Sequence, residues 1–237
     1  MKNISIGKYQ LAIHDSKSIG ICVSGGADSA LLLYIVMANI TQHIHVYTFI
    51  SPDRREAIES HVDAVVDTCS KLTDNSNFTY HKEFVNSQKP DGLFSLFGDK
   101  FETDKIEILY FALTKFPPKE VWEKFEQQQP AWHNNFRDAV VDKPLYGISI
   151  PVNDTDLEHI ASDPNTLAKF ELVMDERAYV PWVNLNKKDI ASMYRELGVE
   201  DQLFKVSRSC ETPAHVGTHC GKCWWCDERR WAFGYLE

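Results

Sequence analysis

Short apolar runs alternate with longer amphipathic segments along the first 85 residues of the chain. Residues 19–23 and 45–50 are almost wholly apolar or β-branched, which is typical of buried strands. Residues 28–40 form a longer apolar run, and residues 54–72 place apolar side chains at helical spacing, so both predict helices. Residues 78–85 alternate as a third strand. This order predicts parallel βαβ units and a Rossmann-like α/β fold.

The middle of the chain has a weaker pattern. Residues 88–103 are expected to be a loop, and residues 104–116 a helix that Pro117 and Pro118 end. Residues 119–143 are rich in aromatic side chains and are interpreted as partly helical, without a defined role.

A further strand is predicted over residues 145–151, with acidic and amide side chains after it. These are Asn153, Asp154 and Asp156, for which a solvated turn competes with a substrate or metal contact. Residues 186–198 predict a helix that Asn186 caps and Gly198 ends.

A polar motif joins the first strand to the first helix: Ser24-Gly25-Gly26-Ala27-Asp28-Ser29. Paired glycines permit a tight turn that approaches a ligand closely, and the N–H groups and dipole of a helix start favour an anion. Ser24 and Ser29 add hydroxyl donors. Asp28 would repel phosphate, so it is interpreted either as the helix cap or as a ligand for a metal ion carried by the phosphates. A plain Gly-Gly turn with cap residues is the alternative.

The motif lacks the lysine of a Walker A loop and the spacing of a dinucleotide fingerprint. It resembles the pyrophosphate loop (PP-loop) of the ATP pyrophosphatase superfamily, Ser-Gly-Gly-x-Asp-Ser, at every fixed position. The resemblance implies an adenine nucleotide alpha hydrolase type of fold. It also implies ATP bound by residues 24–29, cleavage between its α and β phosphates, and adenylation of a substrate oxygen.

Other residues are candidates for the same site, because parallel sheets bind ligands at the carboxyl ends of their strands. Phe49 and Ile50 end the second strand and are candidates for packing on adenine, with ordinary strand residues as the alternative. Lys187 is a candidate for neutralising phosphate charge, with a solvent-facing lysine as the alternative. The catalytic candidates are therefore Asp28, Ser29 and Lys187.

Four of the six cysteines lie close together near the end of the chain: Cys210, Cys220, Cys223 and Cys226. Four thiolates at such spacing are typical of a structural zinc site. An iron–sulfur cluster is the alternative metal group, and His219 is an alternative ligand. Cys22 and Cys69 lie in apolar patterns and are interpreted as core residues. A closing helix is expected after the cysteines.

Composition bounds the class of protein. The chain has 237 residues, 43% of them hydrophobic, which suits one large domain with an appendage. We expect an ATP-binding domain over residues 1–200 and a zinc-binding segment over residues 201–237. A net charge of −9 gives no sign of a general nucleic-acid surface. No apolar run reaches the length of a membrane span, and no signal peptide precedes residue 19, so the expected location is the cytoplasm.

The loop together with the cysteine segment resembles the 7-cyano-7-deazaguanine synthase (QueC) family. Cys220-Gly221-Lys222-Cys223, the following Cys226, and Arg229 match the family's zinc segment, and Pro181 and Lys187 match its Pro-x5-Lys segment. The resemblance implies a zinc-stapled, often homodimeric ligase of queuosine biosynthesis. Such an enzyme uses ATP, Mg²⁺ and ammonia to convert 7-carboxy-7-deazaguanine to an amide and then a nitrile.

The resemblance is confined to the two ends of the chain. After the second strand the family carries an Asp-Tyr-Gly-Gln-Arg-His-like run, where this chain has Ile50-Ser51-Pro52-Asp53-Arg54-Arg55. Two alternative functions therefore stand beside the ligase. One is another PP-loop activity, tRNA thiolation or a sulfonucleotide-reductase-like reaction, and the other is a non-catalytic nucleotide-binding protein.

Overall fold

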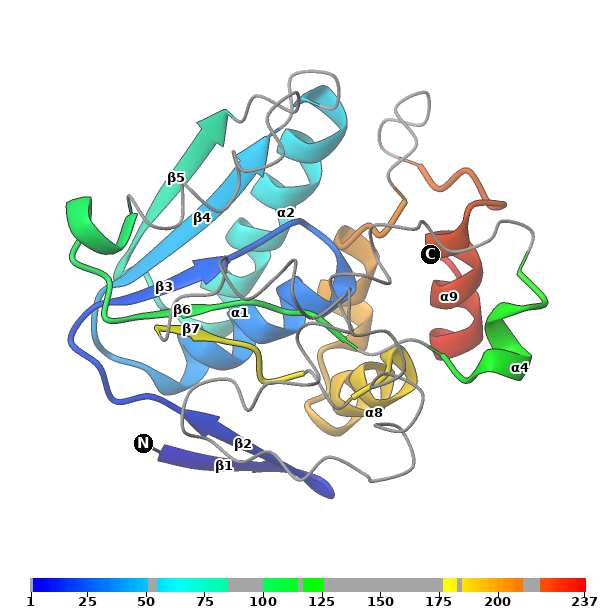
Figure 1. Cartoon of the computed structure of the whole chain (residues 1–237), viewed down its shortest axis with the longest axis horizontal. Coiled ribbons are helices and arrows are strands. Elements are labelled where there is room, and N and C mark those ends of the chain that lie inside the picture. Colours follow the sequence, from blue (N-terminus) through cyan, green and yellow to red (C-terminus); the bar gives the residue numbers. More distant parts are fainter. Residues whose placement is uncertain are drawn as a thin grey trace, which may run out of the picture.

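Five parallel strands form the central sheet of the computed structural model. The structure describes residues 2–50, 55–84, 100–114, 117–125, 177–182, 185–210 and 218–237. The strands are β3 (Ile19–Cys22), β4 (Ile44–Ile50), β5 (Phe78–Phe84), β6 (Ile108–Tyr110) and β7 (Ala178–Tyr179). Across the sheet they run in the order β5-β4-β3-β6-β7 (Figure 1). The order reverses at β3, so the carboxyl ends of β3 and β6 flank the crevice where such sheets bind ligands. The predicted Rossmann-like α/β fold is confirmed.

Two helices pack on the sheet through the main hydrophobic core. Helix α1 (Ala27–Asn39) is buried along most of its length, as its continuous apolar run predicts, and α2 (Arg55–Thr73) is amphipathic. Ile44 and Val46 of β4 join residues of both helices in this core. Because side chains alternate along a strand, His45 and Tyr47 lie on the other face of the sheet.

A second, smaller core covers that other face. Tyr47 packs there with Phe101, Ile106 and Leu109. Gly20 of β3 lets this core close tightly, because a Cβ on Gly20 would lie 2.6 Å from Leu109 Cδ1. Residues 100–103, which the sequence predicted as loop, form a helical turn that supplies Phe101.

The helix predicted over residues 104–116 is wrong. Ile108, Leu109 and Tyr110 form β6, and all three are buried between β3 and β7. A central parallel strand is apolar on both faces, so it lacks the alternation that distinguishes a half-buried strand from a helix. Residues 111–114 and 117–118 are not helical either.

Several predicted features fall outside the described residues. These are the strand over residues 145–151, the side chains of Asn153, Asp154 and Asp156, and residues 126–143 of the aromatic stretch. Within that stretch the structure describes a short helix, α4 (Lys119–Trp122).

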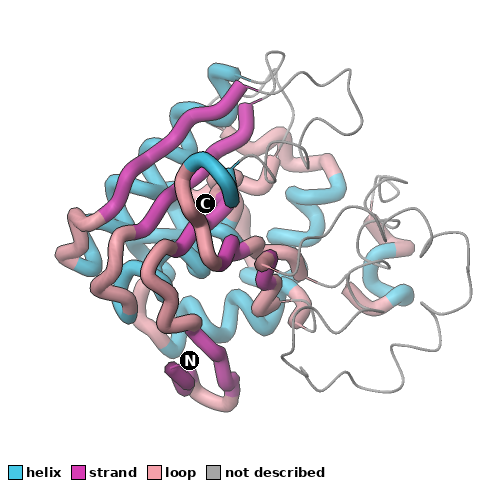
Figure 2. The backbone as a smooth tube through the Cα atoms, turned by 60° about the vertical axis from the view of Figure 1, so that its left-hand side comes forward, coloured by secondary structure: helices cyan, strands magenta, loops and turns pink. Residues whose placement is uncertain are grey.

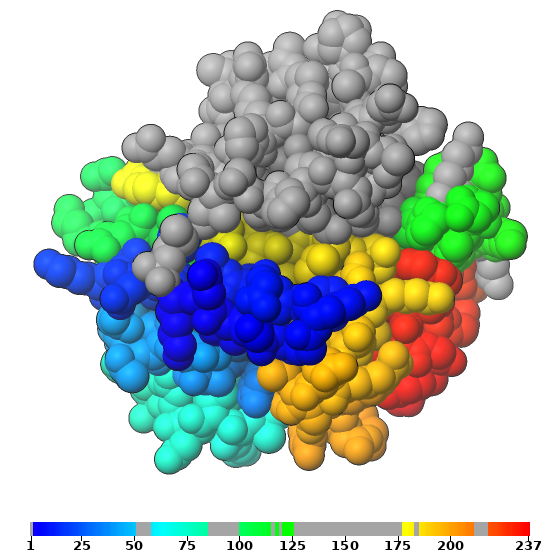
Figure 3. All heavy atoms as spheres, turned by 90° about the horizontal axis from the view of Figure 1, so that it is seen from below, coloured from blue at the N-terminus to red at the C-terminus, as the bar shows by residue number. Residues whose placement is uncertain are grey.

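An antiparallel hairpin that the sequence analysis did not predict precedes the main sheet. It consists of β1 (Lys2–Ile6) and β2 (Tyr9–Ile13), joined by a turn in which Gly7 has a φ of +54°. Its apolar side chains belong to the main core, and the Tyr9 hydroxyl donates to Asp189 Oδ1 at 3.0 Å. Figure 3 shows the hairpin lying across one face of the molecule, beside the segment that contains Asp189.

The C-terminal part contributes three further helical segments: α8 (Lys187–Glu196), a π-helical segment (Glu200–Phe204) and α9 (Trp224–Phe233). Asn186 caps α8 in a full capping box, and Gly198 follows the helix with a φ of +67°, so the predicted start and stop are confirmed. The closing helix is also confirmed, beginning at Trp224. Figure 2 shows helices (cyan) lying beside the strands of the sheet (magenta). The division between domains at residue 200 stays a prediction.

No helix in the described ranges is both long and apolar enough to cross a bilayer.

Arg229 fastens α9 to the segment that leads into the first cysteine. Its side chain is fully buried and donates to the carbonyl groups of Phe204, Ser207 and Leu236 at 2.8, 3.0 and 2.9 Å. The guanidinium also stacks 3.6 Å from the Phe204 ring centroid. Burial lowers the pKa of Arg229 to about 10, so the side chain stays charged at neutral pH.

We expect Arg229→Ala to lower the free energy of unfolding by about 3 kcal/mol or more, because it removes a large buried side chain together with its hydrogen bonds to three carbonyl groups. Urea unfolding followed by circular dichroism measures the change. Arg230→Ala is the control, because the Arg230 side chain is 43% exposed and its ion pair with Asp227 contributes about 1 kcal/mol at most. Equal effects of the two substitutions would contradict this role of Arg229.

Candidate functional site

The residues 24–29 loop follows the carboxyl end of β3 and leads into the first turn of α1. Gly26 is the N-cap of the helix and uses no side-chain cap. The interpretation of Asp28 as the cap is therefore wrong, because Asp28 already lies inside the first turn. The N–H groups of that turn and the positive end of the helix dipole therefore lie close to the carboxyl end of β3.

The two serines hold the shape of this loop. Ser29 Oγ donates to the Gly26 carbonyl at 3.1 Å and accepts from the Ser24 N–H at 3.2 Å. The hydroxyl groups of Ser24 and Ser29 lie 3.2 Å apart. Ser29 is buried. Ser29 therefore stabilises the conformation of the loop through these hydrogen bonds. Its catalytic role stays a prediction.

Gly25 takes a backbone conformation that suits only glycine well, with a φ of +80°. A Cβ at this position would lie 3.2 Å from the side chains of His61 and Val62 on α2. The Gly25 carbonyl accepts from the Arg208 N–H at 2.7 Å. Helix α2 and the segment before the cysteines therefore close on the loop from behind.

Arg208 places a buried cation next to the loop. The residue is 6% exposed, and its Nη1 lies 2.8 Å from Nε2 of His61. Burial, together with the positive charge of Arg208 and the nearby His219, lowers the pKa of His61 to about 4. His61 is therefore neutral and accepts the hydrogen bond. Nε and Nη2 of Arg208 are buried and have no hydrogen-bond partner among the described residues.

A buried ion-pair network contacts the first turn of α1. Lys187 Nζ lies 3.1 Å from Asp28 Oδ2 and 3.0 Å from Glu228 Oε2. The exposed fractions of the Lys187, Asp28 and Glu228 side chains are 6%, 17% and 1%. Burial alone would lower the pKa of Lys187, but the two carboxylates outweigh it and raise that pKa. Lys187 is therefore charged.

The four predicted cysteine ligands come together at the start of α9. Their sulfur atoms lie within 4.8 Å of one another. The separations are 3.5 Å for Cys223–Cys226, 3.8 Å for Cys210–Cys223 and 3.9 Å for Cys220–Cys226. His219 Nδ1 lies 3.9 Å from the Cys226 sulfur and outside the cluster of four, so the cysteines are the better ligand set.

Residues 158–237 match the family model described as queuosine biosynthesis protein QueC. The C-terminal segment is QueC-like. It contains Lys187, Arg208, Glu228 and the four cysteines, although residues 158–176 lie outside the described part of the structure. No curated protein matches the chain.

Two solved structures resemble the chain weakly. One is the U34-tRNA thiolase NcsA from Methanococcus maripaludis with its [4Fe-4S] cluster, at a TM-score of 0.47 and 10% identity. The likeness covers 90% of this chain but only 64% of that protein. The other is NMN synthetase from Francisella tularensis, at a TM-score of 0.36 and 10% identity, covering 94% and 79% of the two chains. Neither likeness bears on what this chain binds.

Two residues of the QueC-like segment that the sequence analysis did not single out, Glu228 and Arg208, lie near the loop. Glu228 follows Cys226 by two positions, and its carboxylate pairs with Lys187, which also contacts Asp28. Arg208, whose N–H donates to the Gly25 carbonyl, adds a further positive charge. Charged side chains of both signs therefore lie next to the loop. Arg208 and Glu228 flank the cysteine motif in the sequence. No local sequence pattern indicates that either residue belongs to the site.

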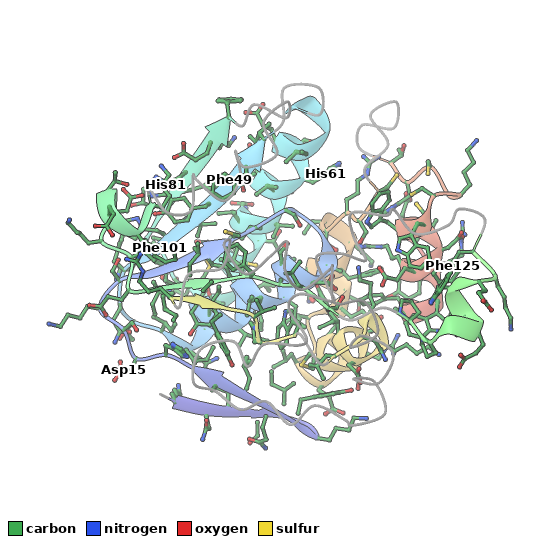
Figure 4. The ribbon with its side chains drawn as sticks, viewed as in Figure 1. Asp15, Phe49, His61, His81, Phe101 and Phe125 are labelled. Carbon is green, nitrogen blue, oxygen red and sulfur yellow. The ribbon has the colours of Figure 1, made fainter. Side chains whose placement is uncertain are left out.

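Phe49 and Ile50 take different positions. They point to opposite faces of β4, where Phe49 packs beside the smaller core and Ile50 is fully buried. Both residues lie at the carboxyl end of β4, which pairs with β3 (Figure 4 labels Phe49). Their contact with adenine stays a prediction.

Proposed function

We propose that the chain is an ATP-dependent ligase that adenylates a carboxylate and transfers the acyl group to ammonia. The observation that supports this most directly is the Lys187 network. It places Lys187 of the QueC-like segment in contact with Asp28 of the loop, and Glu228 of the same segment in contact with Lys187. A glycine-rich turn alone would not explain why the C-terminal segment closes on it with buried charges.

ATP fits the charge distribution around the loop. The β and γ phosphates would lie against the N–H groups at the start of α1, with the buried Nε and Nη2 groups of Arg208 as further donors. Mg²⁺ on the phosphates would take an oxygen of Asp28, which Lys187 holds in place. Lys187 then acts by positioning Asp28, in addition to its predicted effect on phosphate charge.

The reaction forms and breaks one bond at each step. A carboxylate oxygen of the acid attacks the α phosphorus of ATP, and pyrophosphate leaves, giving an acyl-adenylate. Ammonia then attacks the acyl carbon, AMP leaves and the nitrogen loses a proton, giving an amide. The protein's own residues position the phosphates and offset their charge, which supplies most of such catalysis. By resemblance to QueC, the acid is 7-carboxy-7-deazaguanine and a second round yields the nitrile.

The cysteine cluster fits a single tetrahedral ion, and we propose zinc. Four thiolates bound at 2.3 Å to one tetrahedral ion lie about 3.8 Å apart. The three separations above lie close to this value. In a [4Fe–4S] cluster each thiolate binds a different iron, which separates the sulfur atoms further. Zinc here would be structural and would fix the start of α9, and with it Glu228.

Product analysis with a panel of substrates tests the proposed function. AMP and pyrophosphate formed only with 7-carboxy-7-deazaguanine and ammonia would support the ligase. AMP formed only with tRNA or a sulfur donor would overturn it in favour of thiolation. Burial raises the pKa of Cys22 and Cys69, which disfavours a catalytic thiolate at either residue. ATP binding without turnover would favour the non-catalytic alternative.

Arg208→Met tests how ATP is held. The substitution keeps the apolar stem but removes the buried donors, so we expect the affinity for ATP to fall about tenfold or more. Isothermal titration calorimetry with ATP and Mg²⁺ measures it. Lys205→Met is the matched control, because the Lys205 side chain is 60% exposed and lies three residues away. Unchanged affinity in the Arg208 variant would contradict the proposed phosphate contact.

A further inference from the structure

Two histidines and an aspartate gather at the face of the sheet that carries the smaller core. His45 lies on β4, His81 on β5, and Asp104 directly after the helical turn at residues 100–103. One ligand atom of each lies within 4.8 Å of the others, and all three residues are half-buried. Figure 4 labels His81 and Phe101, which belongs to that helical turn.

The two imidazoles face each other through nitrogen atoms. His45 Nδ1 lies 3.1 Å from His81 Nε2, and the rings are stacked with centroids 5.3 Å apart. A divalent ion that binds two imidazole nitrogens tetrahedrally at 2.0–2.1 Å holds them about 3.3 Å apart. A small opening of the pair therefore suffices to admit an ion between the two nitrogens.

The carboxylate of Asp104 is oriented by a hydrogen bond and is the third candidate ligand for the same ion. Tyr47, directly opposite His81 in the sheet, donates its hydroxyl to Asp104 Oδ2 at 2.6 Å. This contact orients the carboxylate and leaves Oδ1 for a ligand, as outer hydrogen bonds do at many metal sites. The nearby cation Lys100 is ion-paired with Glu83, which reduces its repulsion of a bound ion.

We propose that His45, His81 and Asp104 form a second metal site, for a divalent first-row transition ion such as Zn²⁺, Fe²⁺ or Co²⁺. Two imidazoles and one carboxylate suit these ions and leave coordination positions for water or a ligand. The site is separate from the loop, because His45 pairs with Gly20 near the start of β3, whereas the loop follows the end of that strand. The proposal therefore stands independently of the proposed function.

Cobalt binding by the full chain tests this site, with the cysteine cluster already filled by the metal it carries on purification. We expect equilibrium dialysis to show one additional Co²⁺ per chain. Its spectrum should contain visible d–d bands without a new sulfur-to-cobalt charge-transfer band, since no thiolate takes part. His81→Ala and the conservative Asp104→Asn should each weaken this binding at least about tenfold.

His43→Ala is the matched control. His43 lies beside His45, with ring centroids 4.9 Å apart, but its two ring nitrogens contact Asn77 and Thr79 instead. This variant should bind the additional ion as the unmodified chain does. The proposal is overturned if no ion binds beyond the cysteine cluster, if binding survives both the His81 and Asp104 substitutions, or if the sulfur band accompanies it.

Discussion

Asp28→Asn is expected to lower the rate of AMP and pyrophosphate formation by about a hundredfold or more, with the fold and the bound metal retained. The substitution removes the one negative charge that the loop offers to Mg²⁺, and electrostatic groups at a reacting phosphate contribute on this scale. Lys187 keeps its contact with Glu228, so the buried lysine is still paired. Initial rates at saturating ATP and acid measure the effect.

Asp67→Asn is the control for this substitution. Asp67 is an exposed residue of α2 that forms a surface pair with Lys71, and its replacement should leave the rate unchanged. If Asp28→Asn retains more than about a third of the rate, with the metal content and circular dichroism unchanged, Asp28 has no part in the proposed chemistry.

Cys223→Ser is expected to release the ion bound by the cysteine cluster and to destabilise the C-terminal part of the chain. Structural zinc sites contribute roughly 10–16 kcal/mol in small peptides, so we expect the free energy of unfolding to fall by several kcal/mol. Turnover should fall too, because Glu228 lies on the helix that begins at the cluster. Elemental analysis and urea unfolding measure the first two effects.

Cys69→Ala is the control, because it removes a thiol that does not belong to the metal site. Cys69 is fully buried in the main core and lies outside the cluster, so its replacement should release no metal. A Cys223→Ser variant with full metal content and unchanged stability would contradict the assignment of the ligands.

Two parts of the candidate site, the loop and the cysteine cluster, were predictable from local sequence motifs. The loop at residues 24–29 and the four cysteines each depend on close spacing along the chain, and flanking segments of clear periodicity place them on a strand, a turn and a helix. The cap and stop of α8 were predictable for the same reason, because Asn186 and Gly198 act on neighbouring backbone groups.

Features set by contacts between distant segments were not predictable in this way. The strand β6 is three residues long and apolar throughout, so only its place between β3 and β7 distinguishes it from a helix. The N-terminal hairpin does carry a signal, since Ile4 and Ile6 alternate with polar residues before the Gly7 turn. Glu228 and Arg208 gain their roles only when α9 and the segment before Cys210 fold against the loop.

The most direct measurement of the central claim follows an isotope from the acid to the nucleotide. The chain is incubated with ATP, Mg²⁺, ammonia and 7-carboxy-7-deazaguanine labelled with ¹⁸O in its carboxylate, and the products are analysed by mass spectrometry and ³¹P NMR. Adenylation of the carboxylate predicts pyrophosphate and AMP, with one carboxylate ¹⁸O transferred to the AMP phosphate. Unlabelled AMP, or ADP and inorganic phosphate as products, would contradict it.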